Sequence, residues 1–142
     1  MTRAREIMTE GADCAQSGDT LADAARKMRD LGVGALPICG DDDRLEGVVT
    51  DRDIVVRCIA EGGDPGSTPV SELAEGKPVT IGADDPVDEA LRTMIEHGVR
   101  RLPVIDGDRL VGMVSQADVA RETTAEQAGE LVAALSKAPD NN

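Results

Sequence analysis

The spacing of apolar residues changes in the same order twice along this chain. Apolar residues first recur at helical spacing, which predicts an amphipathic helix in each passage. The residues of these two apolar faces are Leu21, Ala24, Ala25 and Met28, and then Val87, Ala90, Leu91 and Met94. We expect the helices to end at Gly32 and Gly98, because glycine readily adopts the left-handed conformation of a helix C-cap. The second helix should begin after an Asp85 N-cap, with Pro86 at its first position.

Two short apolar segments separated by an Asp/Gly turn follow each predicted helix. They read ALPI and LEGVV in the first passage, and RLPV and LVGMV in the second. Such pairs around a tight turn are typical of β-hairpins. Thr50 and Ser115 then provide helix-capping hydroxyls, which predicts a second helix in each passage. The repeated unit is therefore β-α-β-β-α, with short lead-ins at Ile7 and Leu73.

These passages are two copies of one unit, since they align throughout with a single-residue difference in one loop. We therefore expect an α/β (α+β) fold of two tandem repeats. The expected boundaries are a first repeat with its lead-in over 1–62, a linker over 63–69, a second repeat over 70–124, and a C-terminal helix with a frayed tail over 125–142. The apolar face of that last helix comprises Ala128, Leu131, Val132 and Leu135.

Composition argues against several kinds of partner. The chain has 28 acidic and 15 basic residues, and a net charge of −13. Nucleic acids and anionic membranes are bound by basic surfaces, so we expect neither as a partner. There is no Phe, Tyr or Trp to stack on bases. The sequence has no apolar run of about 18 residues and no signal-peptide core, so the expected location is the cytoplasm. Secretion without a conventional signal would leave no mark in the sequence.

No group of residues in the sequence has the pattern of a catalytic or metal site. The single histidine, His97, lies near a predicted helix end, where a surface position is commoner than a catalytic role. No Cys/His pair has metal-ligand spacing, and no phosphate loop or nucleophile motif is present. We therefore expect a protein that is not an enzyme and that holds no metal.

One motif, G-h-[VM]-[ST]-x-x-D with h apolar, occurs at residues 47–53 and 112–118. In one interpretation, Thr50 and Ser115 cap a helix and the aspartate three positions later completes a capping box. In the other, a strand end leading into a helix presents backbone N–H groups, a hydroxyl and a carboxylate at a cleft. The hydroxyl could meet a phosphate, and the carboxylate could accept hydrogen bonds from ribose hydroxyls. The motif alone leaves both interpretations open.

The tandem units, with the passage GVRRLPVID…RLVGMVSQADV, resemble a pair of CBS domains, the Bateman module, over roughly residues 5–125. The resemblance implies pseudo-two-fold symmetry, sheets that meet at the centre, and two clefts there. In many relatives these clefts bind AMP, ADP, ATP or S-adenosylmethionine, with no cofactor required. Such pairs usually associate into disc-like dimers, so the resemblance also implies a homodimer.

The resemblance assigns roles to matching positions. The motif aspartates match ribose-binding residues, and the motif hydroxyls lie on the phosphate side. The Leu-Pro segments and the first strands match the walls around the base, while three arginines are placed to neutralise phosphates. The ligand-binding residues implied in this way are Leu36, Pro37, Thr50, Arg52, Asp53, Thr80, Ile81, Arg100, Arg101, Leu102, Pro103, Ser115 and Asp118.

The two implied clefts differ in sequence. Arg100 and Arg101 of the second copy replace Gly34 and Ala35 of the first, whereas Arg52 of the first copy is replaced by alanine in the second. The first copy also has Cys14 at a position that lies near the base in relatives. We therefore expect the cleft with the two adjacent arginines to be the better nucleotide site.

The three cysteines allow two states. Cys14 opens the first strand and Cys39 ends the second, and neighbouring strands can bring Cα atoms within the roughly 4.4–6.8 Å that a disulfide requires. A cytosolic location instead favours three reduced thiols. Cys58 lies in an apolar helical segment and is expected to be buried. A bridge between the first two would clamp the first repeat and occlude its cleft.

Three hypotheses follow. The leading one is a stand-alone, non-enzymatic regulatory module that binds an adenine nucleotide or S-adenosylmethionine and acts through a protein partner or its own dimer. The alternative is a ligand-free interaction protein, stabilised by a disulfide and associated with stress. A third is an enzyme with Cys14 or Cys39 as a redox thiol, which would need a lowered thiol pKa.

Overall fold

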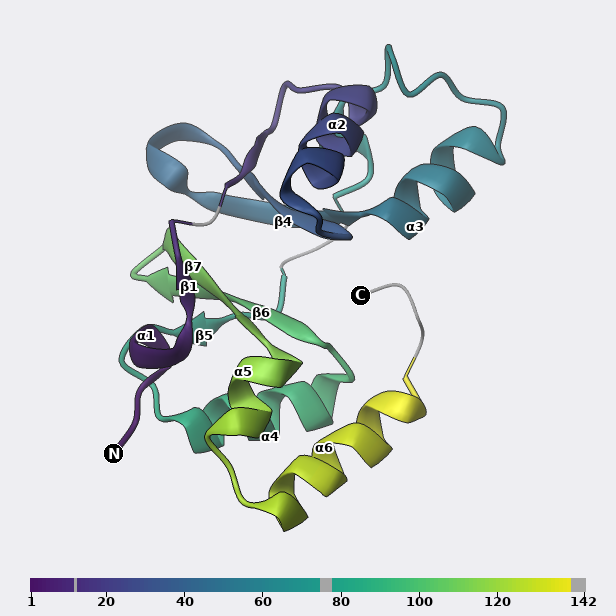
Figure 1. Cartoon of the computed structure of the whole chain (residues 1–142). Helices are drawn as coiled ribbons and strands as arrows, with labels where there is room; N and C mark the ends of the chain where they lie inside the picture. The colour runs from purple at the N-terminus through teal and green to yellow at the C-terminus, as the bar shows by residue number, and fades with distance from the viewer. Residues whose placement is uncertain (12, 75–77, 139–142) are drawn as a thin grey trace. The chain divides into compact units, whose positions relative to one another are not determined.

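Each repeat of the sequence folds around its own β-sheet in the computed structural model (Figure 1). The structure describes residues 1–11, 13–74 and 78–138. These residues form two compact units. One contains residues 13–74 with residue 78, and the other combines residues 1–11 with residues 79–138. The predicted mixed α+β fold of two repeats is thus confirmed, and each unit is described separately below.

The unit of the first repeat is built on a three-stranded sheet in the order β2-β3-β4. Strands β2 and β3 are parallel, and β3 and β4 form the predicted antiparallel hairpin. Helix α2 begins after Thr20, whose hydroxyl accepts the Asp23 N–H, and ends at Gly32 in the left-handed conformation. The elements are β2 (Ala15–Gln16), α2 (Leu21–Leu31), β3 (Ala35–Cys39), η1 (Asp41–Asp43), β4 (Leu45–Thr50), α3 (Asp51–Asp53), the π-helical η2 (Ile54–Ile59) and η3 (Val70–Glu72).

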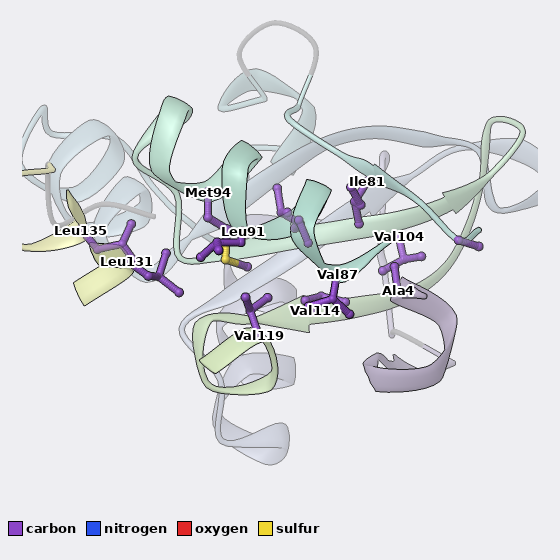
Figure 2. Close-up of a cluster of buried hydrophobic side chains, with 13 residues drawn as sticks. Ala4, Ile81, Val87, Leu91, Met94, Val104, Val114, Val119, Leu131 and Leu135 are labelled. Atoms are coloured by element: carbon purple, nitrogen blue, oxygen red, sulfur yellow. The ribbon is translucent and has the colours of Figure 1, made fainter. Parts of the chain in front are cut away.

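The unit of the second repeat has a four-stranded sheet in the order β1-β7-β6-β5. Its helices α4, α5 and α6 contact one another and enclose the core shown in Figure 2. The fully buried side chains include Met94 of α4, Val119 of α5 and Leu131 of α6. The elements are α1 (Ala4–Ile7), β1 (Thr9–Glu10), β5 (Ile81–Gly82), α4 (Val87–His97), β6 (Arg101–Asp106), β7 (Arg109–Ser115), α5 (Gln116–Arg121) and α6 (Ala125–Ser136).

The lead-in segments pack in the compact unit of the opposite repeat. Strand β1 pairs with β7, opposite Met113 and Gly112. Conversely, Val70 joins the core of the first repeat, and its N–H donates to the Asp19 carbonyl at 2.8 Å. A Cβ at Gly112 would lie 2.7 Å from the Thr9 carbonyl oxygen, and one at Gly47 would lie 2.8 Å from the Ala74 Cβ. The absence of a side chain at the first glycine of each motif therefore leaves space for the lead-in segment that packs against it.

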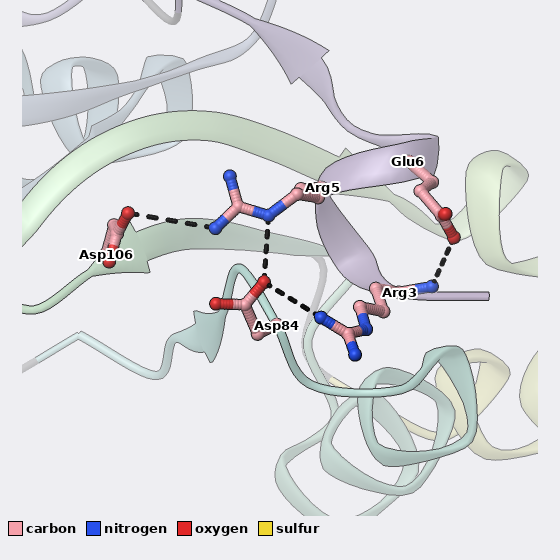
Figure 3. Close-up of polar contacts among 5 residues, drawn as sticks. All are labelled: Arg3, Arg5, Glu6, Asp84 and Asp106. Carbon is pink, nitrogen blue, oxygen red and sulfur yellow. Dashed lines mark hydrogen bonds and ion pairs between the residues drawn. The ribbon is translucent and has the colours of Figure 1, made fainter. Parts of the chain in front are cut away.

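An arginine–aspartate network holds the N-terminal segment in place (Figure 3). Arg5 Nε donates to Asp84 Oδ1 at 2.9 Å, and Arg5 Nη2 lies 3.7 Å from Asp106 Oδ2. Arg3 Nη1 also reaches Asp84 Oδ1, at 3.5 Å. The hydrogen bond and charge of Arg5 lower the pKa of Asp84, and Asp84 in turn raises the pKa of Arg5. The network thus ties the lead-in to the turn before α4.

Three details differ from the sequence prediction. Asp85 is not the N-cap of α4, because its carboxylate accepts the Gly82 N–H and closes the preceding turn. Pro86 is extended and occupies the cap position instead, so the helix begins at Val87. Ala25 and Val132 are exposed, since each lies at the edge of its helix's apolar face.

The compact units also group the chain differently from the repeat boundaries expected from the sequence. Residues 1–11 belong to the unit of the second repeat, because β1 joins its sheet. The expected 63–69 linker packs onto α2, where the Leu21 N–H donates to the Thr68 carbonyl at 2.9 Å. The repeat boundaries themselves stay a prediction. The predicted frayed tail falls mainly on residues 139–142, outside the part of the chain that the structure describes.

Candidate functional site

The doubled motif forms the same turn where β4 and β7 meet the helices that follow them. The Ser115 N–H donates to Asp118 Oδ2 at 2.8 Å, and the Asp118 N–H donates back to Ser115 Oγ at 3.2 Å. The Thr50 N–H and the Asp53 carboxylate form the equivalent bond at 3.0 Å, as do the Asp53 N–H and the Thr50 hydroxyl. The capping box is therefore present in both repeats, and it fixes the direction of both side chains.

The second oxygen of each motif aspartate faces an arginine three or four positions later in the chain. Asp118 Oδ1 accepts a hydrogen bond from Arg121 Nη2, and Asp53 Oδ1 lies 3.7 Å from Arg57 Nη1. The Asp118 side chain is 12% exposed, so only a small part of its surface is accessible to a ligand. A carboxylate has about four lone-pair sites. Ribose hydroxyls could therefore bind Asp118 alongside its main-chain bond, in competition with Arg121.

A pocket of about 330 Å³ opens beside this turn in the second repeat. Arg101 lies opposite Ser115 across the β6–β7 ladder, and the Gln116 N–H donates to the Arg100 carbonyl at 2.9 Å. This register brings two guanidinium-bearing residues next to the motif hydroxyl. Among the described residues, the pocket is lined by Arg100, Arg101, Ser115, Gln116, Ala117 and Ala120. Of the predicted site residues, the structure thus gathers Arg100, Arg101 and Ser115 in one lining, with Asp118 bonded to Ser115.

The first repeat has the same backbone register with different side chains. Ala35 lies opposite Thr50, and the Asp51 N–H donates to the Gly34 carbonyl at 2.9 Å. An acidic residue, Asp51, therefore stands where the second repeat has neutral Gln116. Arg52 is exposed and its N–H donates to Asp51 Oδ1 at 2.8 Å. The turn of the first repeat is thus poorer in positive charge than that of the second.

The residues predicted to surround a base lie mainly in the two hydrophobic cores. Leu36 and Leu102 are 2% and 0% exposed, and the prolines that follow them, Pro37 and Pro103, are also buried. Ile81 is buried at the start of β5, and Thr80 is half-buried just before it. None of the four from the second repeat (Thr80, Ile81, Leu102, Pro103) lines the pocket beside Arg101. Contact between these residues and a base stays a prediction.

Cys14 and Cys39 are joined by a disulfide, with their Cα atoms 5.7 Å apart. Strand β2 runs parallel to β3 with Gln16 opposite Cys39, so Cys14, the residue before β2, lies two residues away from that register and bridges to Cys39 diagonally. Cys58 is a buried free thiol, as its apolar surroundings predicted. The bridge therefore closes the first repeat across its parallel strand pair.

Neither a metal cluster nor a membrane-spanning helix is found in the described part of the chain. No three His, Cys, Asp or Glu residues come together there in a way that could hold a metal ion. His97 is exposed in the last turn of α4. None of the described helices is both long and apolar enough to cross a bilayer.

Sequence reasoning missed several residues around the pocket. Gln116 and Ala120 are four positions apart on α5 and therefore share one face of the helix, but neither has chemistry that marks a site in the sequence. Arg121 follows Asp118 by three positions, which is ion-pair spacing on a helix. The contact between Arg100 and the Leu135 carbonyl had no signal in the sequence, since 35 residues separate the two.

Comparison with known proteins identifies the repeats. The family model of the CBS domain matches residues 4–59 and again residues 70–125. The chain is 50% identical over 121 residues to Hypoxic response protein 1 of Mycobacterium tuberculosis, and this match covers 85% of each chain.

Solved structures agree in fold. A crystal structure of Hypoxic Response Protein I with two coordinated zinc ions has a TM-score of 0.80 and 49% identity, and the match covers 87% of this chain and 100% of that one. The CBS domain pair of protein MJ0100, in complex with 5′-methylthioadenosine and S-adenosyl-L-methionine, has a TM-score of 0.74 and 25% identity, covering 86% and 95% of the two chains. The resemblance seen in the sequence is confirmed: this chain belongs to the CBS domain family and carries two CBS domains.

Proposed function

We propose that this chain is a non-enzymatic regulatory module that binds an adenine nucleotide at the pocket beside Ser115. The observation that carries the proposal is the convergence of Arg100 and Arg101 on that pocket, next to the motif hydroxyl. In a chain of net charge −13, such a local pair of cations favours an anionic ligand. The volume of about 330 Å³ lies within the range typical of small-molecule sites.

Each side chain has a distinct part in the proposed site. Arg101 is exposed and supplies a guanidinium, which suits phosphate oxygens because it offers planar, paired donors. Ser115 offers its hydroxyl on the same side. Asp118 accepts hydrogen bonds from the ribose, while its capping bond keeps the carboxylate in place.

These charges favour a nucleotide over S-adenosylmethionine. The MJ0100 pair binds S-adenosylmethionine and methylthioadenosine, neither of which has a phosphate. S-adenosylmethionine carries a sulfonium cation, which two adjacent arginines would repel. AMP, ADP and ATP instead bring two or more negative charges to the same place. We therefore rank the phosphate-bearing ligands first for this chain.

Regulation would act through a protein partner or through a homodimer. Support for an apolar contact comes from η2, where Val55, Val56 and Ile59 are 55%, 42% and 53% exposed. Adjacent exposed aliphatic side chains of this kind are typical of surfaces that become covered. Ligand binding would then favour one state of that assembly over another.

Calorimetric titration of the purified protein with AMP, ADP, ATP and S-adenosylmethionine tests the proposal. We expect micromolar binding of at least one nucleotide, a weaker affinity in Arg101→Ala, and loss of binding in Asp118→Ala. Asp53→Ala is the matched control, because it removes the same capping carboxylate from the first repeat. Thermal unfolding of both aspartate variants separates a lost cap from a lost ligand contact. The proposal would be overturned if no nucleotide gave a heat of binding with either the oxidised or the reduced protein.

The alternative is a ligand-free interaction protein associated with stress or hypoxia. The disulfide between Cys14 and Cys39 favours it, together with the 50% identity to Hypoxic response protein 1. In that case no nucleotide should raise the unfolding temperature, whereas reduction of the bridge should lower it. Stabilisation by a nucleotide would instead decide for the ligand-binding module.

A further inference from the structure

Arg100 makes a long-range contact that links the pocket to the last helix. Its Nη2 donates to the Leu135 carbonyl at 2.7 Å, at the C-terminal end of α6. A guanidinium is well placed there, because the carbonyls at a helix C-terminus carry partial negative charge. The same residue lines the pocket with Ser115 and Gln116. One side chain therefore belongs both to the proposed ligand site and to the docking of α6.

Helix α6 is held to the second repeat by two leucines. Leu131 and Leu135 are 0% and 2% exposed and lie in the core with Leu91, Met94 and Val119 (Figure 2). The outer face of the helix is open, and Val132 is 50% exposed. Where the second repeat has Arg100, the first has Gly34. The arginine thus occurs in the repeat that carries the extra helix.

We propose that Arg100 couples occupancy of the pocket to docking of α6, so that ligand and helix stabilise each other. A guanidinium has five N–H donors in a fixed fork, so one group can donate hydrogen bonds to the Leu135 carbonyl and to an anion at the same time. Docking of α6 restricts this long side chain to the pocket, which lowers the entropy lost when the ligand binds. Linkage requires the reverse effect of equal free energy: a bound anion must shift the equilibrium of α6 toward its docked state.

Amide hydrogen exchange tests this coupling, with ATP as the probe. The inference rests on the proposed function, so calorimetry first establishes that ATP binds. Saturating ATP should then slow exchange of the amides of residues 131–138 by about fivefold or more, the lower end of typical coupling between sites. ATP binding with unchanged exchange in α6 would overturn the coupling and leave the proposed function standing. If ATP gives no heat but AMP or ADP binds, that nucleotide replaces ATP as the probe, and no binding of any of the three would overturn both.

Two neighbouring arginines give a matched pair of variants. Arg100→Ala removes the contact to α6, so exchange of residues 131–138 should quicken without ligand and should not slow at an ATP concentration that saturates the variant. Arg101→Ala weakens ATP binding, yet at saturation it should still slow exchange in α6 as the wild type does. An equal response of α6 to ATP in the two variants would refute the role of Arg100.

A reciprocal measurement starts from the helix. Leu131→Ala weakens the docking of α6 and changes no residue that lines the pocket. The affinity for ATP should fall several-fold in this variant, provided that circular dichroism shows a folded protein. Unchanged affinity, with α6 shown by exchange to be undocked, would contradict the proposal.

Discussion

Gly112→Ala tests how the lead-in strand is accommodated on the second repeat. A Cβ at this position would lie 2.6 Å from Met8 Sδ and 2.7 Å from the Thr9 carbonyl oxygen, well inside ordinary contact distance. The Met8 side chain can rotate away. The Thr9 carbonyl belongs to β1, which pairs with β7 at this point, so it moves only if the strand moves. Overpacking of this kind costs about 1–3 kcal/mol, and displaced backbone places Gly112→Ala in the upper half of that range.

Equilibrium unfolding in urea measures this cost, with two companion variants. Gly129→Ala is the control, because nothing lies within 4 Å of its added Cβ in α6. That variant should be more stable than the wild type by about 0.5–1 kcal/mol, since alanine favours a helix interior over glycine. Adding Met8→Ala to Gly112→Ala should restore only part of the loss, because the Thr9 carbonyl remains. Wild-type stability of Gly112→Ala, or full rescue by Met8→Ala in a double-mutant cycle, would refute the argument.

Three further outcomes are expected. Ser115→Ala should lower the free energy of unfolding by about 1 kcal/mol, as lost N-caps do, and urea unfolding that shows no change would contradict the cap. Reduction of the Cys14–Cys39 bridge, which has a sequence separation of 25, should lower stability by about 3.5 kcal/mol in the chain-entropy model, as thermal unfolding with and without reductant would show. Asp84, whose pKa Arg5 lowers, stabilises the fold above its unfolded pKa of about 3.9 and loses this effect as pH falls through the lower folded pKa. Asp84→Asn should therefore show a flatter loss of stability on acidification, whereas unchanged acid dependence would contradict the ion pair.

The local order of helices and strands was readable from the sequence, since it depends on near neighbours. Helical spacing gave the faces of α2 and α4, and Gly32 and Gly98 end these helices in the left-handed conformation as predicted. The capping boxes of both motifs also follow from residues three positions apart. The N-terminus of α4 was wrong by one residue, because Asp85 has a competing partner, the Gly82 N–H, that a capping pattern does not show.

Of the candidate site, the sequence supplied the contrast in charge. Arg100 and Arg101 could be compared with Gly34 and Ala35 once the repeat was aligned, and the two ladders show that these positions are equivalent. The remaining lining came from the fold, since Gln116 and Ala120 have no distinctive chemistry in the sequence. The position of a pocket depends on how side chains from different elements pack, and the amino-acid composition does not determine that packing.

The sequence by itself determined the doubled unit, the order of its main helices and strands, and its resemblance to the family, because each depends on periodicity and short motifs. Only the tertiary structure decided that the N-terminal segment joins the sheet of the second repeat, that Cys14 reaches Cys39, and that Arg100 reaches Leu135. Each of these contacts joins residues far apart along the chain. Such pairings are set by the packing of whole elements, in which many distant residues act together, and no short stretch of sequence encodes them.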